Sequence, residues 1–274
     1  MLTVTPKLLT QISIAEKQGL LGKLKGLCFD IDDTFSTHGK ITSEAFQALW
    51  NLKNAGVKLI PVTGRPAGWC DHIARFWPVD AVVGENGAFT LYMEKDANGR
   101  EKLRRFDTLP DEENTIAKSK LSALRARIEK EFPGCSFASD QAYREFDLAI
   151  DFCEDVTPWK DSEVTRLVKV CEDAGAIAKI SSIHVNTWFG KYTKIEGIQK
   201  LLGSEVGKKL NLPSMNELIF AGDSPNDEPM FAAFQESVGV ANVKKFLPQM
   251  KNPPKYITDG EAGVGFAELA KFML

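Results

Sequence analysis

The chain has 274 residues, 43% of them hydrophobic, and its formal net charge is −3 at pH 7. This length suits one large α/β domain or two smaller ones, and the hydrophobic content is ample for buried cores. The charge offers no basic stripe for a nucleic-acid backbone, and no apolar run approaches the ~20 residues needed to cross a bilayer, so we expect neither nucleic-acid nor membrane partners.

The N-terminal segment and the cysteines bear on location. Residues 1–25 lack the basic region, long apolar core and cleavage site of a signal peptide, and they predict an extra helix before the first strand. The five cysteines are scattered and form no C-x-x-C pair. This pattern favours reduced thiols over a disulfide framework or a zinc site, so we expect a cytoplasmic protein. The sequence leaves its oligomeric state open.

Residues 24–34, LKGLCFDIDDT, form an apolar run that ends in three acids and a threonine. Such a run is typical of a strand buried on both faces of a parallel sheet, where active sites gather at the carboxyl ends. The carboxylates of Asp30, Asp32 and Asp33 would repel one another, so the cluster favours a bound cation. On this segment alone, a surface turn after a strand explains the same residues equally well.

The segments that follow alternate strands with helices. Before residue 88 we expect helices over 43–55 and 66–76 and strands over 57–62 and 80–83. After residue 190 we expect helices over 191–207 and 266–274 and strands over 217–221, 237–242 and 255–258. A strand, helix and strand of this length form a right-handed crossover between parallel neighbours. Asp30 and Thr63 are therefore expected at the same edge of one sheet.

Between these parts the pattern changes. FTLYMEK and KLRRFDT flank a turn at Asn98-Gly99, which predicts a hairpin. The elements expected after it are a helix over 112–131, a strand over 146–152, a helix over 161–174 and a further element over 179–188. We therefore expect an α/β fold: residues 1–87 and 189–274 form a Rossmann-like parallel-sheet core with helices on both faces, and residues 88–188 form an inserted α+β cap domain.

Four segments bring polar side chains to one edge of the expected sheet. Their members are Asp30, Asp32 and Thr34; Thr63; Lys194; and Asp223 with Asp227. Hydrophobic strands precede three of the four segments, so the whole set is far more specific than any one member. Taken alone, Thr63 is an ordinary turn residue and Lys194 a solvated helix charge. Asp223 and Asp227 would be helix-capping acids.

The joint set resembles the four motifs of the haloacid dehalogenase superfamily of phosphohydrolases. D-x-D-x-T corresponds to residues 30–34, the second-motif threonine to Thr63 in PVTGR, and GDxxND to residues 222–227. The motif lysine is Lys194 in YTKIEG, with Lys191 as the alternative. The insert follows the second motif, whose T-G-R-P sequence is followed by a strand that ends in G-E-N-G-A. This arrangement resembles the type II cap branch, which includes Cof-like, sucrose, trehalose and mannosyl-3-phosphoglycerate phosphatases.

The resemblance implies a role for each matched residue. Asp30 would be the nucleophile that forms an aspartyl-phosphate, and Asp32 the general acid and base. Mg²⁺ would be bound by Asp30, Asp32 through its backbone carbonyl, Asp223 and Asp227, the last as a ligand or as the partner of one. The phosphoryl oxygens would be held by Thr63, Gly64 and Lys194.

Other polar residues are assigned supporting roles. We expect Asp33 to be structural or salt-bridging, and Arg65 to pair with an acid near the site. His184 and Asn186 would share a strand face in the cap. Together with Arg144 and Trp188, they are candidates for contacting the leaving group of the substrate. Packing roles are nevertheless favoured for all four residues.

The leading hypothesis is a Mg²⁺-dependent phosphomonoester hydrolase acting on a small phosphorylated metabolite, with a sugar phosphate favoured. A phosphomutase resembling phosphomannomutases is the alternative enzyme. A non-catalytic phosphate-binding protein is a third hypothesis, disfavoured because the set of acids is intact. A dehalogenase is disfavoured because displacing a halide needs no leaving-group acid such as Asp32.

Overall fold

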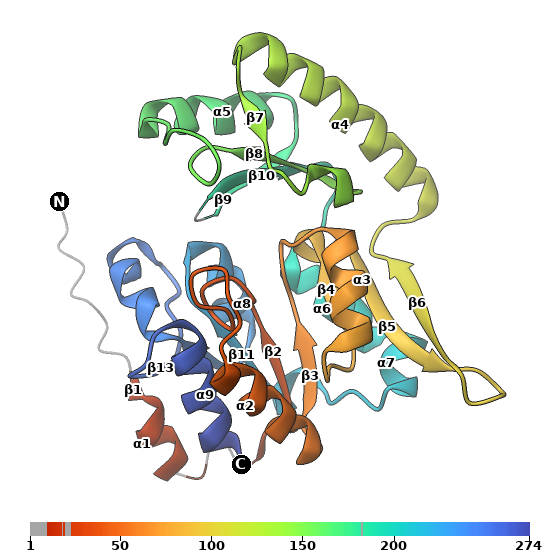
Figure 1. Cartoon of the computed structure of the whole chain (residues 1–274), viewed down its shortest axis with the longest axis vertical. Helices are drawn as coiled ribbons and strands as arrows, with labels where there is room; N and C mark the ends of the chain where they lie inside the picture. The colour runs from red at the N-terminus through yellow and green to blue at the C-terminus, as the bar shows by residue number, and fades with distance from the viewer. Residues whose placement is uncertain (1–9, 18, 20–22, 182) are drawn as a thin grey trace.

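The larger of the two parts seen in Figure 1 is built on a sheet of short parallel strands. The computed structural model describes residues 10–17, 19, 23–181 and 183–274. In sheet order the strands are β1 (Thr10–Gln11), β13 (Tyr256–Ile257), β12 (Glu236–Gly239), β11 (Leu218–Gly222), β2 (Gly26–Phe29) and β3 (Lys58–Pro61). All neighbouring pairs run parallel, so the carboxyl ends meet at the edge of the sheet that faces the second part.

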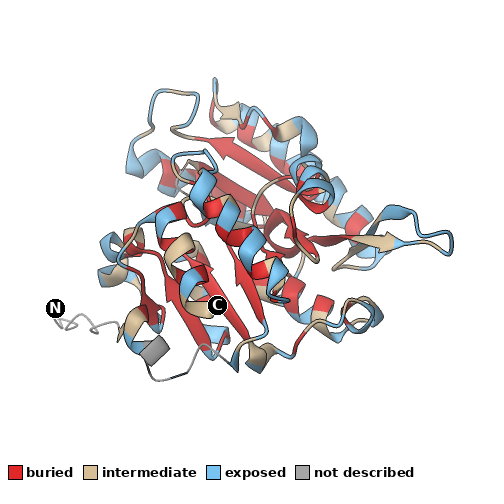
Figure 2. Ribbon diagram, turned by 60° about the horizontal axis from the view of Figure 1, so that its bottom comes forward, coloured by how far each residue is buried: buried red, intermediate tan, exposed pale blue. Residues whose placement is uncertain are grey.

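Both faces of this sheet are covered because β2 has apolar side chains on each. Leu27 and Phe29 belong to one hydrophobic cluster and Cys28 to the other, as the two-residue period of a strand requires. The first cluster includes residues of α1 (Ile12–Lys17), α2 (Ser43–Asn54) and α9 (Ala262–Met273). The second includes residues of α6 (Lys194–Gly203) and α8 (Glu228–Ala233). The predicted doubly covered parallel sheet is confirmed, and Figure 2 shows its strands buried between helices.

A second, antiparallel sheet extends the core beyond β3. It consists of β4 (Val82–Gly84), β5 (Phe89–Lys95) and β6 (Glu101–Asp107), with α3 (Ala67–Phe76) packed against it. A parallel bridge from Val62 to Val83 joins it to the core strands. Tyr92 and Phe106 of the hairpin pack in the same hydrophobic cluster as Phe220 of the core. The cap boundary at residue 88 stays a prediction; this packing favours one after the hairpin, near residue 108, and we propose that boundary.

The second part has its own sheet and its own core. Its elements are α4 (Asp111–Glu131), β7 (Ser136–Phe137), the 3₁₀ turn η3 (Gln141–Tyr143), β8 (Asp147–Asp151), α5 (Asp161–Asp173), β9 (Ile177–Ile180) and β10 (His184–Trp188). The strands form an antiparallel sheet in the order β7-β8-β10-β9. Leu124 and Leu167 of the two helices pack against Ile150 and Val185 of this sheet. In Figure 1 this part lies across the carboxyl ends of the core strands.

Several element boundaries differ from those expected; α9, for example, begins at Ala262 and not at residue 266. The helix expected over 191–207 is two helices, because Ser204 takes an extended conformation and caps α7 (Glu205–Lys209) by accepting from the Gly207 amide. β12 ends at Gly239, three residues before the expected end of the strand over 237–242. The element over 179–188 is the end of one strand and the whole of the next.

The N-terminal segment is described in part. The expected extra helix is observed as α1. Residues 1–9, 18 and 20–22 lie outside the described residues. Within the described part of the chain, no helix combines the length and the apolar character that a membrane crossing requires.

Candidate active site

Three buried carboxylates gather where β2 and β11 end. These strands are paired in parallel with Phe29 opposite Ala221, and the Asp30 amide donates to Ala221 O at 2.9 Å. Asp30 and Asp223 therefore leave the sheet side by side, and Asp227 joins them from the turn that follows. Carboxylate oxygens of the three lie within 4.8 Å of one another.

Lys194 provides the cation of this cluster. It opens α6 and is buried, with its Nζ 2.6 Å from Asp30 Oδ1 and 2.8 Å from Asp227 Oδ1. Lys191 is exposed, so the structure brings Lys194 to the acids and not Lys191. Burial disfavours the Lys194 ammonium, but the carboxylates of Asp227 and Asp30 outweigh that effect and raise its pKa.

The acids outnumber their buried cation. Burial raises the pKa of Asp30 to about 7. The positive charge of Lys194 lowers this pKa, and the negative charge of Asp227 raises it further. Burial, and then the charges of Asp227 and Asp30, raise the pKa of Asp223 well above its ordinary value. Three carboxylates with one ammonium leave an excess of negative charge in a buried site, which a divalent cation would neutralise.

Two polar side chains orient Asp223. Thr34 Oγ1 donates to Asp223 Oδ1 at 3.2 Å, and Asn242 Nδ2 donates to Asp223 Oδ2 at 3.2 Å. Asn242 also donates to the backbone carbonyl of Asp33, whose φ of 55° lies in the turn over residues 32–35. The backbone of Asp33 thus forms part of this turn and Asp33 lines the cavity described below, so its expected structural or salt-bridging role stays a prediction. The sequence did not predict a site role for Asn242, because the residue was expected to lie inside the strand over 237–242.

The second motif lies beside the first. Val62 N donates to Phe29 O at 2.8 Å, so the loop after β3 starts next to Asp30. Thr63 is buried, and its Oγ1 accepts from the Arg65 amide at 3.0 Å, which leaves the hydroxyl hydrogen able to donate. Gly64 lines the cavity described below, whereas Thr63 is fully buried and is not among its lining residues.

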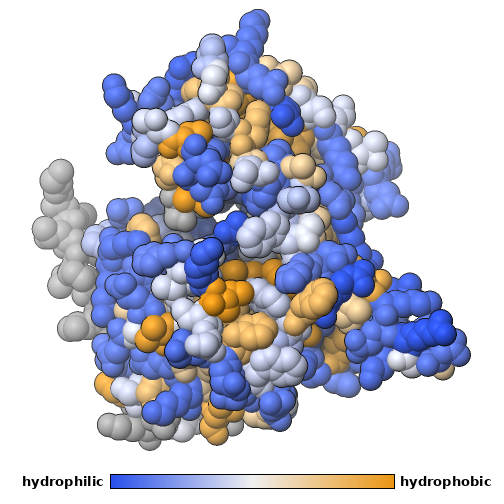
Figure 3. All heavy atoms as spheres, viewed as in Figure 1, coloured by the Kyte–Doolittle hydropathy of each residue, from blue (hydrophilic) through white to orange (hydrophobic). Residues whose placement is uncertain are grey.

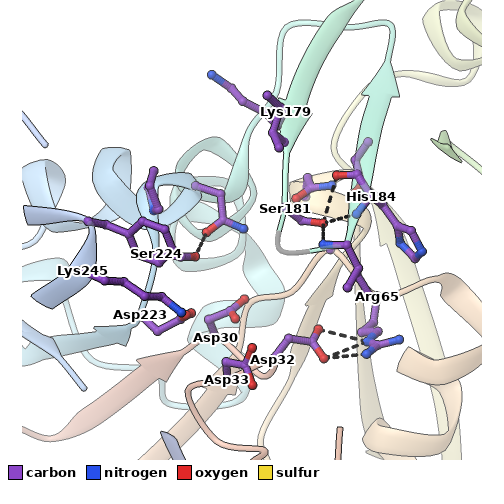
Figure 4. Close-up of a pocket in the computed structure, with 18 of the residues that line it drawn as sticks. Asp30, Asp32, Asp33, Arg65, Lys179, Ser181, His184, Asp223, Ser224 and Lys245 are labelled. Carbon is purple, nitrogen blue, oxygen red and sulfur yellow. Dashed lines mark hydrogen bonds and ion pairs between the residues drawn. The ribbon is translucent and has the colours of Figure 1, made fainter. Parts of the chain in front are cut away.

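Asp32 points away from the three buried acids and is paired with Arg65. Arg65 Nη2 lies 2.6 Å from Asp32 Oδ1, and Arg65 Nε lies 2.9 Å from Asp32 Oδ2, a bidentate geometry. Figure 4 shows this pair beside the cavity, with Asp30 and Asp223 facing the same space. The ion pair expected for Arg65 is confirmed.

A cavity of about 690 Å³ separates the core from the cap, and Figure 3 shows the hollow between the two parts. Its core wall includes Asp30, Asp32, Gly64, Arg65, Asp223 and Lys245. Its cap wall includes Arg144, Lys179, Ser181, Ile183, His184 and Asn186. Trp188, named with the cap candidates, instead packs in a hydrophobic cluster and donates from Nε1 to Tyr192 O at 3.1 Å.

Polar contacts also join cap and core beside the cavity. Glu85 is fully buried and accepts from the amides of Ala67 in the core and of Glu145, Phe146 and Asp147 in the cap. Burial, followed by the charge of Asp147, raises the pKa of Glu85 to about 8, although the amides act in the other direction. The G-E-N-G-A sequence could have pointed to Glu85, because an acid inside an apolar strand end needs buried partners.

The donor set suits a hard cation. The three clustered acids offer carboxylate oxygens, the ligands that Mg²⁺ prefers. The side chain of Asp32 lies outside this cluster, so the structure tests only Asp30, Asp223 and Asp227 as carboxylate ligands. Asp227 uses one oxygen for Lys194 and the other for the Asp223 amide, which fits a supporting position better than a primary one.

Comparisons with known proteins agree with this geometry. Residues 27–135 match the family model of haloacid dehalogenase-like hydrolases, a stretch that contains the first two motifs. A phosphoglycolate phosphatase of Methanothrix thermoacetophila is 34% identical over 92 residues. That match covers 32% of this chain and 39% of the relative, so the chain spans about two fifths of the length of the curated relative it matches.

Solved structures match the fold of nearly the whole chain. A HAD/COF-like hydrolase from Plasmodium vivax has a TM-score of 0.66 at 18% identity, covering 94% of this chain and 98% of the other. The sucrose-phosphatase of Synechocystis sp. has a TM-score of 0.60 at 17% identity, covering 91% and 98%. Identities this low establish the fold alone. The chain thus resembles the haloacid dehalogenase-like hydrolases: residues 27–135 match their family model, and the fold of nearly the whole chain, a core with an inserted cap, matches their solved structures.

Proposed function

We propose that the chain is a Mg²⁺-dependent phosphomonoester hydrolase that works through an aspartyl-phosphate on Asp30. The observation that carries the proposal is the buried cluster of Asp30, Asp223 and Asp227 around Lys194, of which Asp30 and Asp223 line the cavity between core and cap. Such a cluster is suited to the charge of a phosphoryl group once a divalent cation offsets the carboxylates.

The chemistry divides between two aspartates. An Asp30 carboxylate oxygen attacks phosphorus, the bond from phosphorus to the leaving oxygen breaks, and Asp32 donates a proton to that oxygen. Water then attacks the phosphorus of the aspartyl-phosphate, Asp32 accepts a proton from it, and Asp30 is released with phosphate. Bound Mg²⁺, held by Asp30 and Asp223 with Asp227 behind them, would supply charge neutralisation. Thr63, Gly64 and Lys194 would hold the phosphoryl oxygens.

The substrate class follows from the relatives and the cavity. A phosphoglycolate phosphatase and a sucrose-phosphatase are among the similar proteins, and both names denote small phosphorylated metabolites. A cavity of about 690 Å³ holds a molecule of that size, and its cap wall combines polar side chains suited to hydroxyl groups, such as Ser181 and Asn186, with Ile180 and Ile183. We therefore propose a small phosphorylated metabolite, with sugar phosphates as the favoured class. A cytoplasmic location stays a prediction.

The test is phosphate release from a panel of phosphorylated metabolites with and without Mg²⁺. Asp30→Asn should lower kcat/KM by at least about 10³-fold because it removes the nucleophile. Asp33→Asn is the matched control: it changes the neighbouring acid, and asparagine tolerates the positive φ at that position. Normal turnover by Asp30→Asn would overturn the nucleophile assignment. Transfer of phosphate within the substrate, without release, would instead favour the phosphomutase.

A further inference from the structure

A chain of alternating charges runs from the reaction centre into the cap. Asp32 pairs with Arg65 at 2.6 Å, and Arg65 Nη1 lies 3.8 Å from Asp140 Oδ2 across the boundary between core and cap. Asp140 Oδ1 accepts from Arg144 Nε at 3.0 Å, and Arg144 Nη1 donates to Asp147 Oδ1 at 3.0 Å. The core thus contributes the first two members and the cap the other three.

The cap end of this chain is fixed. The side chains of Arg144 and Asp147 are 2% and 0% exposed. Asp147 also accepts from Asn186 Nδ2 at 3.1 Å, within the cap sheet. Arg144 Nη1 further donates to the backbone oxygen of Gly64 at 3.0 Å, directly beside Arg65. Buried ions with several partners hold their geometry, so a shift of the cap would carry Asp140 with it.

The core end is less constrained. The Asp32 side chain is 37% exposed, and within the described part of the chain its carboxylate takes its side-chain hydrogen bonds from Arg65. The guanidinium of Arg65 lies 4.5 Å from the ring centroid of Trp69, which limits its orientations. Arg65 is therefore shared between a partly exposed acid at the proposed reaction centre and a more buried acid in the cap.

We propose that Arg65 is a positioning residue that holds Asp32 in line with the leaving group, and that Asp140 of the cap sets how Arg65 is held. The inference rests on the proposed function, because it needs Asp32 to transfer a proton to the leaving oxygen. Its physical basis is a shared cation: one guanidinium contacts both carboxylates, at 2.6 and 3.8 Å, so the contact with Asp140 helps to fix the orientation in which Arg65 holds Asp32. The alignment of Asp32 then depends on a residue of the cap.

The test compares two leaving groups. An alkyl phosphate such as glycerol phosphate needs a proton on its leaving oxygen, whereas p-nitrophenolate leaves without one. In the presence of Mg²⁺, Arg65→Gln should lower kcat/KM for the alkyl ester by about 10²-fold and for p-nitrophenyl phosphate by less than about threefold. Arg65→Lys keeps the charge but loses the bidentate geometry, so it should fall between Arg65→Gln and the wild type.

A variant on the cap side, Asp140→Asn, tests whether the effect of Arg65 comes from positioning Asp32 or only from the loss of its positive charge. Asp140→Asn should show the same preference for the better leaving group, with a smaller loss. It should add little to Arg65→Gln in the double variant, because the two residues act through one contact. Arg75→Gln is the matched control: Arg75 forms an exposed ion pair with Asp71 on α3, and its loss should leave both kcat/KM values unchanged.

The outcomes are distinguishable. If wild-type protein releases phosphate from neither ester nor from the metabolite panel, the proposed function fails. If wild type is active but Arg65→Gln loses equally on both esters, Arg65 binds phosphate or supports the fold and the positioning inference is overturned. The same holds if Asp140→Asn behaves like the Arg75→Gln control.

Discussion

Among single residues, Lys194 is a buried cation that contacts two buried acids. Its ammonium is buried and is stable there because two carboxylates contact it at 2.6 and 2.8 Å. Removing one member of such a group leaves the others buried and uncompensated, which costs about 3–5 kcal/mol. The role proposed for this lysine in binding phosphate and its contribution to stability therefore rest on the same two contacts.

A comparison of the two candidate lysines tests this view. Lys194→Met should lower kcat/KM by at least about 10²-fold and lower the free energy of unfolding by a few kcal/mol. Lys191→Met should change neither by a measurable amount, because Lys191 is exposed. Enzyme assays and urea denaturation of both variants check the prediction. Equal effects of the two substitutions would contradict it.

Glu85 makes stability depend on pH. Its pKa is about 8 in the folded chain against an ordinary 4.5, so the folded state binds its proton more tightly than the unfolded state does. This contribution to stability is complete below about pH 4.5 and is lost as the pH rises to about 8. Glu85→Gln cannot ionise, so its free energy of unfolding should fall less than that of wild type between pH 5 and pH 8.

The matched control for Glu85 is Glu217→Gln. Lys25 and Ser214 lower the pKa of Glu217 to about 2, so its contribution to stability is present above about pH 4.5 and is lost as the pH falls toward 2. Its removal should leave the slope between pH 5 and pH 8 unchanged. Urea denaturation at pH 5, 6, 7 and 8 gives both slopes, and a Glu85→Gln slope equal to that of wild type would refute the assignment.

At the scale of elements, the turn after β4 sets the position of α6. Gly87 has a φ of 105°, and a Cβ there would lie 2.1 Å from the backbone oxygen of Thr193, immediately before Lys194. The first turn of α6 thus packs directly on the Gly87 backbone, and this contact helps to place the Lys194 ammonium among the acids.

Two glycine substitutions isolate that contact. Gly87→Ala should displace the first turn of α6 and lower kcat/KM by at least about tenfold, with a loss of stability well beyond the ~1–2 kcal/mol of left-handed backbone strain. Gly99→Ala carries similar strain at φ 76° but meets no atom within 4 Å, so it should retain full activity. Thermal unfolding and assays of both variants make the comparison. A fully active Gly87→Ala would show that α6 is positioned by other contacts.

At the scale of the whole molecule, the acid cluster links metal binding to folding. Only the folded chain brings Asp30, Asp223 and Asp227 together, so Mg²⁺ should stabilise it, by about 2.7 kcal/mol at a concentration 100 times the dissociation constant. Asp223→Asn should reduce this gain strongly. The measurement is the unfolding temperature with and without Mg²⁺, with Asp33→Asn as the control that keeps the gain. No shift for wild type would exclude this cluster as a metal site.

The core and most of its polar carboxyl edge could be predicted from the amino-acid sequence. A strand buried on both faces must be apolar throughout, and parallel strands share one carboxyl edge, so the residues after β2, β3 and β11 could be assembled from the chain alone. Asp30 and Asp223 were found in this way. The ion pair of Arg65 also followed from its place in the motifs.

How the cap and core meet could not be predicted in this way, because it depends on contacts between segments that are distant in the chain. The contacts of Glu85 with residues 145–147, and of Arg65 with Asp140, join segments about 60 to 75 residues apart in the chain. The local hydrophobic periodicity of a segment does not predict contacts between side chains of such distant segments. The choice between Lys191 and Lys194 and the docking of the hairpin on the core depended on the same kind of contact, because a side chain's partners are set by packing between elements rather than by the elements themselves.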